Sequence, residues 1–138
     1  LSVFTTEIQR LANDAEKQLS NNNGLNLVIA ANYGGRWDIV ESAKKIAIKS
    51  VNGELDPEKI DTSLFNAHSS LAEFPKVDLL IRTSGELRIS NFLLWEIAYS
   101  ELYFCNTLWP DFDEHELDTA IESFHLRERR FGKRNGEK

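Results

Sequence analysis

The sequence predicts an α/β domain in which a mostly parallel sheet is covered by helices on both faces. Short apolar runs typical of buried strands occur at residues 26–32, 77–81 and 102–107. Segments with helical spacing of apolar residues separate these runs, and such alternation favours parallel strands joined by right-handed crossovers. Because three strands are fewer than the roughly five or six of an average sheet, we expect an incomplete domain.

The first expected element is an amphipathic helix that ends at a turn rich in asparagine and glycine. Its apolar positions are Phe4, Ile8, Leu11, Ala15 and Leu19. The strand predicted next, NLVIAAN, is a continuous apolar run, which suggests burial on both faces.

A second helix is expected after this strand, and Asn52-Gly53 is a suitable C-terminal stop for it. Asp56 before Pro57, and Asp61 a few residues later, predict two short helical connectors. The inner face of the second helix is predicted to consist of Ile39, Val40, Ala43, Ile46, Ala47 and Val51.

The C-terminal half of the chain is predicted to contain two strands and two helices. VDLLI, residues 77–81, is the first of these strands, and Ser90 is expected to cap a helix over residues 91–99. LYFCNT is the other strand. Asp113 and Glu116 then form a capping-box pattern at the start of a helix whose buried face is Leu117, Ile121 and Phe124.

Composition indicates one domain spanning residues 1–138 in a reducing cytoplasm. The chain is 41% hydrophobic and 28% charged, and no apolar run approaches the roughly 20 residues of a membrane span. Its single cysteine, Cys105, cannot form an intramolecular disulfide and is expected to be a small buried hydrophobe. The net charge of −6 argues against a nucleic-acid partner. Because the sequence opens on Leu1 and has no methionine, we expect it to be part of a longer protein.

The residues best suited to bind a ligand follow the second predicted strand, in the stretch LLIRTSGELRISNF. The carboxyl end of a parallel strand is where α/β proteins usually hold ligands. Arginine forks, a glycine turn and a helix N-terminus all suit phosphate, although Arg82 and Arg88 could instead pair with Glu86 or other acids. The candidate residues are Arg82, Thr83, Ser84, Gly85, Arg88 and Ser90.

Two long segments resemble the C-terminal half of the cis-prenyltransferases, specifically the undecaprenyl diphosphate synthase group. They are DLLIRTSGELRISNFLLWEIAYSELYFCNTLWPDFDE, residues 78–114, and NLVIAANYGGRWDIV, residues 26–40. The resemblance implies repeated condensation of isopentenyl diphosphate onto farnesyl diphosphate, with Mg²⁺ and cis geometry. It also implies a homodimer that makes the lipid carrier of bacterial cell-wall synthesis and touches the inner membrane face through that lipid product.

The same resemblance implies roles for individual residues of this chain. Arg82, Arg88 and Ser90 would hold the diphosphate of isopentenyl diphosphate, with Ile89 lining the same stretch. Glu101, in AYSELYF, would contribute to the Mg²⁺ site. A C-terminal arginine-x-glycine element would also lie near the diphosphate, and Arg130 and Gly132 match its spacing.

The sequence also departs from the family pattern. Ser84 stands where the family usually has the first glycine of Arg-Thr-Gly-Gly-Glu, so a slightly altered loop is expected. The catalytic aspartate of Asp-Gly-Asn-Gly-Arg-Trp is expected in an N-terminal half, and no catalytic residue is assigned in this chain. Residues 32–37, NYGGRW, begin with asparagine and are not given that role.

Two other functions stay open, a non-catalytic diphosphate-binding subunit of the same family and a generic anion-binding α/β domain. The histidines lack metal-ligand spacing and are expected at the surface or in helices. The tryptophans are expected to be packing anchors. These residues are His68, His115 and His125, and Trp37, Trp95 and Trp109.

Overall fold

The computed structural model describes residues 3–127 of the chain. The described residues divide between Tyr33 and Gly34 into two units. Among residues 3–127, no helix is both long and apolar enough to cross a membrane.

The first unit contains one helix, α1, which spans Thr6–Leu19 as its apolar spacing predicts. Thr5 precedes it, and its hydroxyl accepts a hydrogen bond from the Ile8 amide at 3.5 Å. The strand expected at residues 26–32 is not formed, and the side chain of Leu27 is 77% exposed. A strand needs a hydrogen-bonded neighbour, and within the described part of the chain no strand pairs with this run.

The second unit begins with α2, which spans Gly35–Val51 and ends at Asn52, as predicted. The prediction of its buried face is only partly right, because Ile46 is buried as expected while other predicted positions are not. Gly35, Asp38, Ser42 and Ile46 are buried, whereas Val40 and Val51 are exposed. The buried stripe is largely polar because it hydrogen-bonds a turn of the chain: the Ser42 hydroxyl donates to the His68 carbonyl at 3.2 Å.

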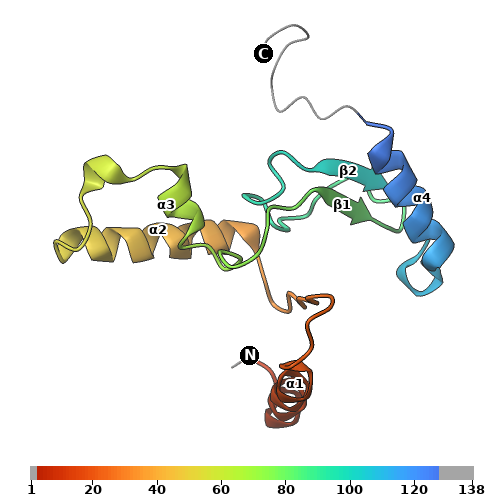
Figure 1. Cartoon of the computed structure of the whole chain (residues 1–138), viewed down its shortest axis with the longest axis horizontal. Helices are drawn as coiled ribbons and strands as arrows, with labels where there is room; N and C mark the ends of the chain where they lie inside the picture. The colour runs from red at the N-terminus through yellow and green to blue at the C-terminus, as the bar shows by residue number, and fades with distance from the viewer. Residues whose placement is uncertain (1–2, 128–138) are drawn as a thin grey trace, which may run out of the picture. The chain divides into compact units, whose positions relative to one another are not determined.

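Both predicted connectors are confirmed. The short 3₁₀ helix η1 spans Pro57–Lys59 and is capped by Asp56. The helix α3 spans Thr62–Asn66, and the Asp61 carboxylate accepts from the Leu64 amide at 2.8 Å. α3 packs against α2, as Figure 1 shows.

The sheet is formed by β1, Leu79–Arg82, and β2, Glu101–Phe104, which pair in parallel (Figure 1). Both elements confirm predicted strands. Leu79 lies beside Glu101 and Arg82 beside Phe104. The 3₁₀ helix η2, Trp109–Asp111, and the helix α4, Glu114–His125, follow β2.

α4 packs against β2, and its start confirms the predicted cap. The Asp113 carboxylate accepts from the Glu116 amide at 3.0 Å. The predicted buried face is only partly right, because Ala120 is the fully buried residue while Leu117 and Ile121 are exposed.

The pairing of the two strands continues beyond their ends. The Cys105 amide donates to the Arg82 carbonyl at 3.0 Å, and the Gly85 amide donates to the Cys105 carbonyl at 2.9 Å. The Ser84 amide donates to the Thr107 carbonyl at 2.8 Å. The turn after β1 is therefore fixed to the segment after β2. Cys105 itself is half-buried and free, not fully buried as predicted.

The helix expected over residues 91–99 is replaced by turns. Ser90, Asn91 and Leu93 have φ of 48°, 64° and 45°, in the left-handed region that interrupts a right-handed helix. One helix-like hydrogen bond remains, from the Ile97 amide to the Leu93 carbonyl at 3.0 Å. Ser90 is therefore not a helix cap, and that prediction was wrong.

We expect Ser84→Gly to stabilise the fold. Ser84 has φ of 68°, which costs an ordinary L-residue about 1–2 kcal/mol, whereas glycine adopts it freely but loses more chain entropy. The net gain in free energy of unfolding should be about 0.5–1 kcal/mol, measured by urea denaturation. Ser84→Ala is the matched control, since it removes the hydroxyl but keeps the strain. Equal stability of the two variants would contradict the argument.

Candidate functional site

The predicted anion-binding loop begins at the carboxyl end of β1, as expected. Arg82 is the last residue of the strand and is half-buried. Its Nε atom is shielded from solvent and makes no hydrogen bond to any residue in the described part of the chain. A buried guanidinium nitrogen without an acceptor is costly, which marks Arg82 as a residue whose hydrogen bonds are incomplete within the described residues.

A cavity of about 300 Å³ opens beside Arg82. Its volume is at the lower end of the range of about 300–1,000 Å³ that is usual for small-molecule sites. Arg82 and Thr83 supply the polar part of the wall, and the remainder is apolar. The lining residues are Leu80, Ile81, Arg82, Thr83, Ile89, Phe92 and Trp109.

The other predicted ligand residues lie at different positions around this cavity. Ile89 is half-buried and lines it. Arg88 is exposed and forms an ion pair with Glu86, which is the alternative that the sequence left open for this arginine. Ser90 is also exposed and does not line the cavity. Arg82 and Ile89 therefore line the cavity, whereas Arg88 and Ser90 lie on the same loop but are exposed at the surface.

Glu101, the predicted metal ligand, lies at the opposite end of the strands. It pairs with Leu79 in the register, three residues before Arg82, which corresponds to roughly 10 Å along the strand. Its carboxylate accepts from Arg127 Nη1 at 3.1 Å, and the same guanidinium donates to the Leu102 carbonyl at 2.8 Å.

A self-contained metal centre is not assembled around Glu101. Within residues 3–127, no group of three or more histidine, cysteine, aspartate or glutamate side chains is placed to hold an ion. The carboxylate is instead occupied by an arginine. The described residues by themselves therefore do not fit an all-protein Mg²⁺ site.

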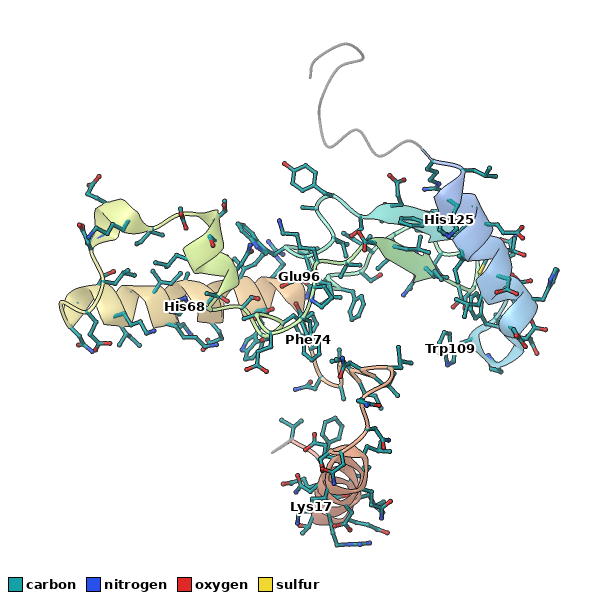
Figure 2. The ribbon with its side chains drawn as sticks, in the orientation of Figure 1. Lys17, His68, Phe74, Glu96, Trp109 and His125 are labelled. Carbon is teal, nitrogen blue, oxygen red and sulfur yellow. The ribbon has the colours of Figure 1, made fainter. Side chains whose placement is uncertain are left out.

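The predicted contacts of Arg130 and Gly132 lie outside the described residues. Sequence reasoning missed two aromatic members of the cavity wall, Phe92 and Trp109. Trp109 was expected to be a packing anchor, but it is 73% exposed and stacks on Phe112 with ring centroids 6.0 Å apart. Figure 2 shows it in the turn that precedes α4. Pro110, which follows Trp109, is a sequence signal of irregular backbone and could have predicted that this tryptophan lies in a loop.

The other two tryptophans were also expected to be packing anchors, and the prediction holds for only one of them. Trp37 is also exposed rather than a packing anchor. Trp95 does pack as predicted, against Phe65 with ring centroids 4.3 Å apart, and its indole nitrogen donates to Asn66.

A pair of carboxylates that the sequence did not predict lies near the start of α2. Asp38 is 3% exposed and accepts from the amide and the hydroxyl of Ser70, at 3.0 and 2.7 Å. The carboxylate oxygens of Glu96, which is labelled in Figure 2, are shielded from solvent. They make no well-formed hydrogen bond within the described residues. Burial, with a smaller contribution from the negative charge of Asp38, raises the pKa of Glu96. Its own backbone amide and Ser69 offset only part of this shift.

The comparison with known families decides what kind of protein this site belongs to. A prenyltransferase family model described as "Putative undecaprenyl diphosphate synthase" matches residues 1–132. The chain belongs to this family. The match includes the strand, loop and aromatic residues that surround the cavity.

Two curated relatives carry the same name, ditrans,polycis-undecaprenyl-diphosphate synthase ((2E,6E)-farnesyl-diphosphate specific). The chain is 52% identical to the protein of Escherichia coli K12 over 131 residues, which is 95% of this chain and 52% of the relative. It is 54% identical to the protein of Wigglesworthia glossinidia brevipalpis over 135 residues, which is 98% of this chain and 52% of that relative. The chain therefore spans about half the length of these relatives.

Two solved structures share the fold, which confirms the predicted α/β class with a parallel sheet and helices. Lavandulyl diphosphate synthase from Lavandula x intermedia, in complex with dimethylallyl diphosphate, is 42% identical with a TM-score of 0.91. The match covers 96% of this chain and 57% of the lavandulyl diphosphate synthase chain. A probable undecaprenyl diphosphate synthase from Campylobacter jejuni is 30% identical with a TM-score of 0.80. This match covers 96% of this chain and 60% of the Campylobacter jejuni chain.

We expect Glu96→Gln to change how stability depends on pH. Because the folded-state pKa of Glu96 is raised above the ordinary value of 4.5, the folded state holds a proton that the unfolded state has released. The free energy of unfolding should therefore fall as pH rises from about 4.5 to the raised pKa. Glutamine removes this loss, so the variant should be the more stable one at pH 7 and not at pH 4.

This expectation is measured by thermal unfolding between pH 4 and pH 8. Glu58→Gln is the matched control, since Glu58 is an exposed glutamate in η1. A pH profile of Glu96→Gln that runs parallel to that of the parent chain would contradict the assigned role of burial.

Proposed function

We propose that this chain carries the isopentenyl diphosphate subsite of a cis-prenyltransferase. In the protein of full family length, the reaction would be repeated condensation of isopentenyl diphosphate onto farnesyl diphosphate, making undecaprenyl diphosphate for bacterial cell-wall synthesis. The names of the curated relatives support this reaction and this allylic substrate. The chain belongs to this family. What is proposed here is the substrate and the product.

One observation carries the proposal: Arg82, whose Nε makes no hydrogen bond within the described residues, lines a small, mainly apolar cavity. Isopentenyl diphosphate is an anion attached to a five-carbon apolar group, so it needs these two surfaces side by side. Arg82 offers the positive charge, and Ile89, Phe92 and Trp109 offer the apolar wall. A generic phosphate site would need the first surface and not the second.

Each predicted ligand residue has a distinct part in this proposal. Arg82 would bind the diphosphate with a planar fork of donors, and Arg88 would add a second fork after leaving Glu86. Ser90 would donate its hydroxyl to an outer oxygen. Arg130 and Gly132, beyond the described residues, are proposed to complete the diphosphate contacts from the C-terminal end.

The reaction breaks the bond between C1 of the allylic substrate and its diphosphate oxygen. The double-bond electrons of isopentenyl diphosphate form the new carbon–carbon bond, and loss of one proton restores a double bond with cis geometry. The residues of this chain would hold the attacking molecule in line, and positioning of this kind lowers a barrier by up to about 7–11 kcal/mol. The apolar wall would keep water from the cationic carbon.

We also propose that this chain would hold Mg²⁺ only together with the substrate diphosphate, and not by its own side chains alone. The ion commonly keeps several waters and takes one or two carboxylates together with substrate phosphates. When bound, Mg²⁺ would neutralise charge on a diphosphate. Glu101 is the carboxylate proposed to contribute, provided that it exchanges its ion pair with Arg127 for the ion.

The remaining proposals concern the setting of the protein. We propose a cytoplasmic homodimer that contacts the membrane through its lipid product and does not bind nucleic acid. A sheet with unpaired edges can pair with further strands, and the β1–β2 pair has no other strand beside it among residues 3–127. The net charge of −6 disfavours nucleic acid.

Arg82→Lys should weaken the binding of isopentenyl diphosphate by about 1.5–3 kcal/mol, because lysine keeps the charge but loses the fork. Isothermal titration calorimetry on the chain would measure the affinity, with inorganic pyrophosphate as the tail-less comparison. Arg88→Lys should have a smaller effect, because Arg88 is exposed and already paired. An unchanged affinity in Arg82→Lys, or no preference of the parent chain for isopentenyl diphosphate over pyrophosphate, would refute the proposed function.

Glu101→Gln should shift the Mg²⁺ dependence of isopentenyl diphosphate binding to higher concentration, because the amide keeps the shape but loses the charge. Arg127→Gln is the matched control. It breaks the same ion pair while leaving the carboxylate in place, so it should keep or lower the Mg²⁺ requirement. If both variants show the same Mg²⁺ titration as the parent chain, Glu101 is a structural acid.

A further inference from the structure

The start of α2 is capped by an asparagine that lies 55 residues further along the chain. The Asn91 carbonyl accepts from the Gly35 amide at 2.7 Å, and its side-chain Oδ1 accepts from the Arg36 amide at 2.9 Å. Gly34, the N-cap residue of the helix, has no side chain to fill this place. Asn91 therefore satisfies two of the amides that a helix leaves unpaired at its first turn.

The contact is close enough to require glycine on the helix side. A Cβ at Gly34 would lie 2.9 Å from Asn91 Nδ2, and a Cβ at Gly35 would lie 2.8 Å from Leu94 Cγ. Both distances are shorter than van der Waals contact. The two glycines thus permit the backbone of the segment at Asn91 to approach the helix directly.

The backbone of this segment is bent to make the contact. Ser90, Asn91 and Leu93 all have φ between 45° and 64°. Asparagine tolerates this region better than most residues, whereas leucine does not, so the bend costs conformational energy. The two hydrogen bonds to α2 are a stabilising interaction that offsets this cost.

The position of Asn91 connects this contact to the ligand loop. Arg88, Ile89 and Ser90 immediately precede it in sequence. The loop is fixed at its beginning by Ser84 and Gly85, whose amides donate to the segment after β2. At its end it is fixed by Asn91 on α2. Between these two anchors, Ile89 reaches the cavity and the Ile89 carbonyl accepts from the Phe92 amide at 3.1 Å.

We propose that Asn91 is a positioning residue, which holds the Arg88–Ser90 backbone in place for a diphosphate by capping α2. It touches neither the cavity nor the ligand and acts through the backbone of its neighbours. The proposal rests on the proposed function for the identity of the ligand, although the anchoring would apply to any diphosphate. Removal of the side chain should therefore loosen the loop and reduce anion affinity more than it reduces global stability.

Asn91→Gly is the test variant, because glycine accepts φ of 64° and removes the side-chain acceptor. The expected result is a roughly tenfold weaker affinity for inorganic pyrophosphate and for isopentenyl diphosphate, by titration calorimetry on the same chain. Amide hydrogen exchange should become faster at Arg36 and over residues 86–92. The melting temperature should fall no further than in the control variant.

Asp61→Ala is the matched control, since it removes the side-chain cap of α3 within the same unit. It should lower the melting temperature and leave pyrophosphate affinity unchanged. The proposal is overturned if Asn91→Gly binds pyrophosphate as tightly as the parent chain does, if the control loses as much affinity, or if the parent chain does not bind pyrophosphate. If Asn91→Gly loses affinity but the parent chain does not distinguish isopentenyl diphosphate from pyrophosphate, the positioning role stands and the proposed function fails.

Discussion

The parallel pairing of β1 and β2 is the constraint on which the candidate site depends. Its hydrogen bonds continue past the last strand residues, so the turn at Ser84 and Gly85 is tied to the segment that leads to Trp109. Arg82 is thereby held at the end of β1, while Trp109 of the cavity wall is supplied by the segment that follows β2. A parallel ladder places both carboxyl ends at one edge, and this is why a loop rich in donors meets an apolar surface there.

Polar groups, rather than a large apolar core, connect the remaining parts of the second unit. The buried side of α2 presents Asp38 and Ser42 to the turn at residues 68–70, and Asn91 supplies the cap that Gly34 cannot. Buried polar atoms must be hydrogen-bonded, so such contacts specify geometry more strictly than apolar packing does. Glu96 departs from this rule, and its raised pKa is the consequence.

The errors in the sequence-based predictions have a shared physical cause. Residues 91–99 have good helical spacing, and residues 26–32 have good strand composition, yet neither forms the predicted element. The first segment does not form a helix, because its backbone turns at Asn91, which accepts hydrogen bonds from the distant start of α2. The second has strand-forming side chains but no paired neighbour among the described residues. Periodicity reports local preference, whereas both outcomes depend on partners far away in sequence.

The sequence by itself determined the caps at Asp56, Asp61 and Asp113, the two strands, and the presence of arginines after the first strand, because each depends on neighbouring residues. It also carried the resemblance that the family match confirms. Only the tertiary structure decided that Arg82 lines a cavity together with Trp109, and that Glu101 lies at the other end of the sheet. Strand register and long-range hydrogen bonds set these relations, and neither is encoded in the spacing of residues along one segment.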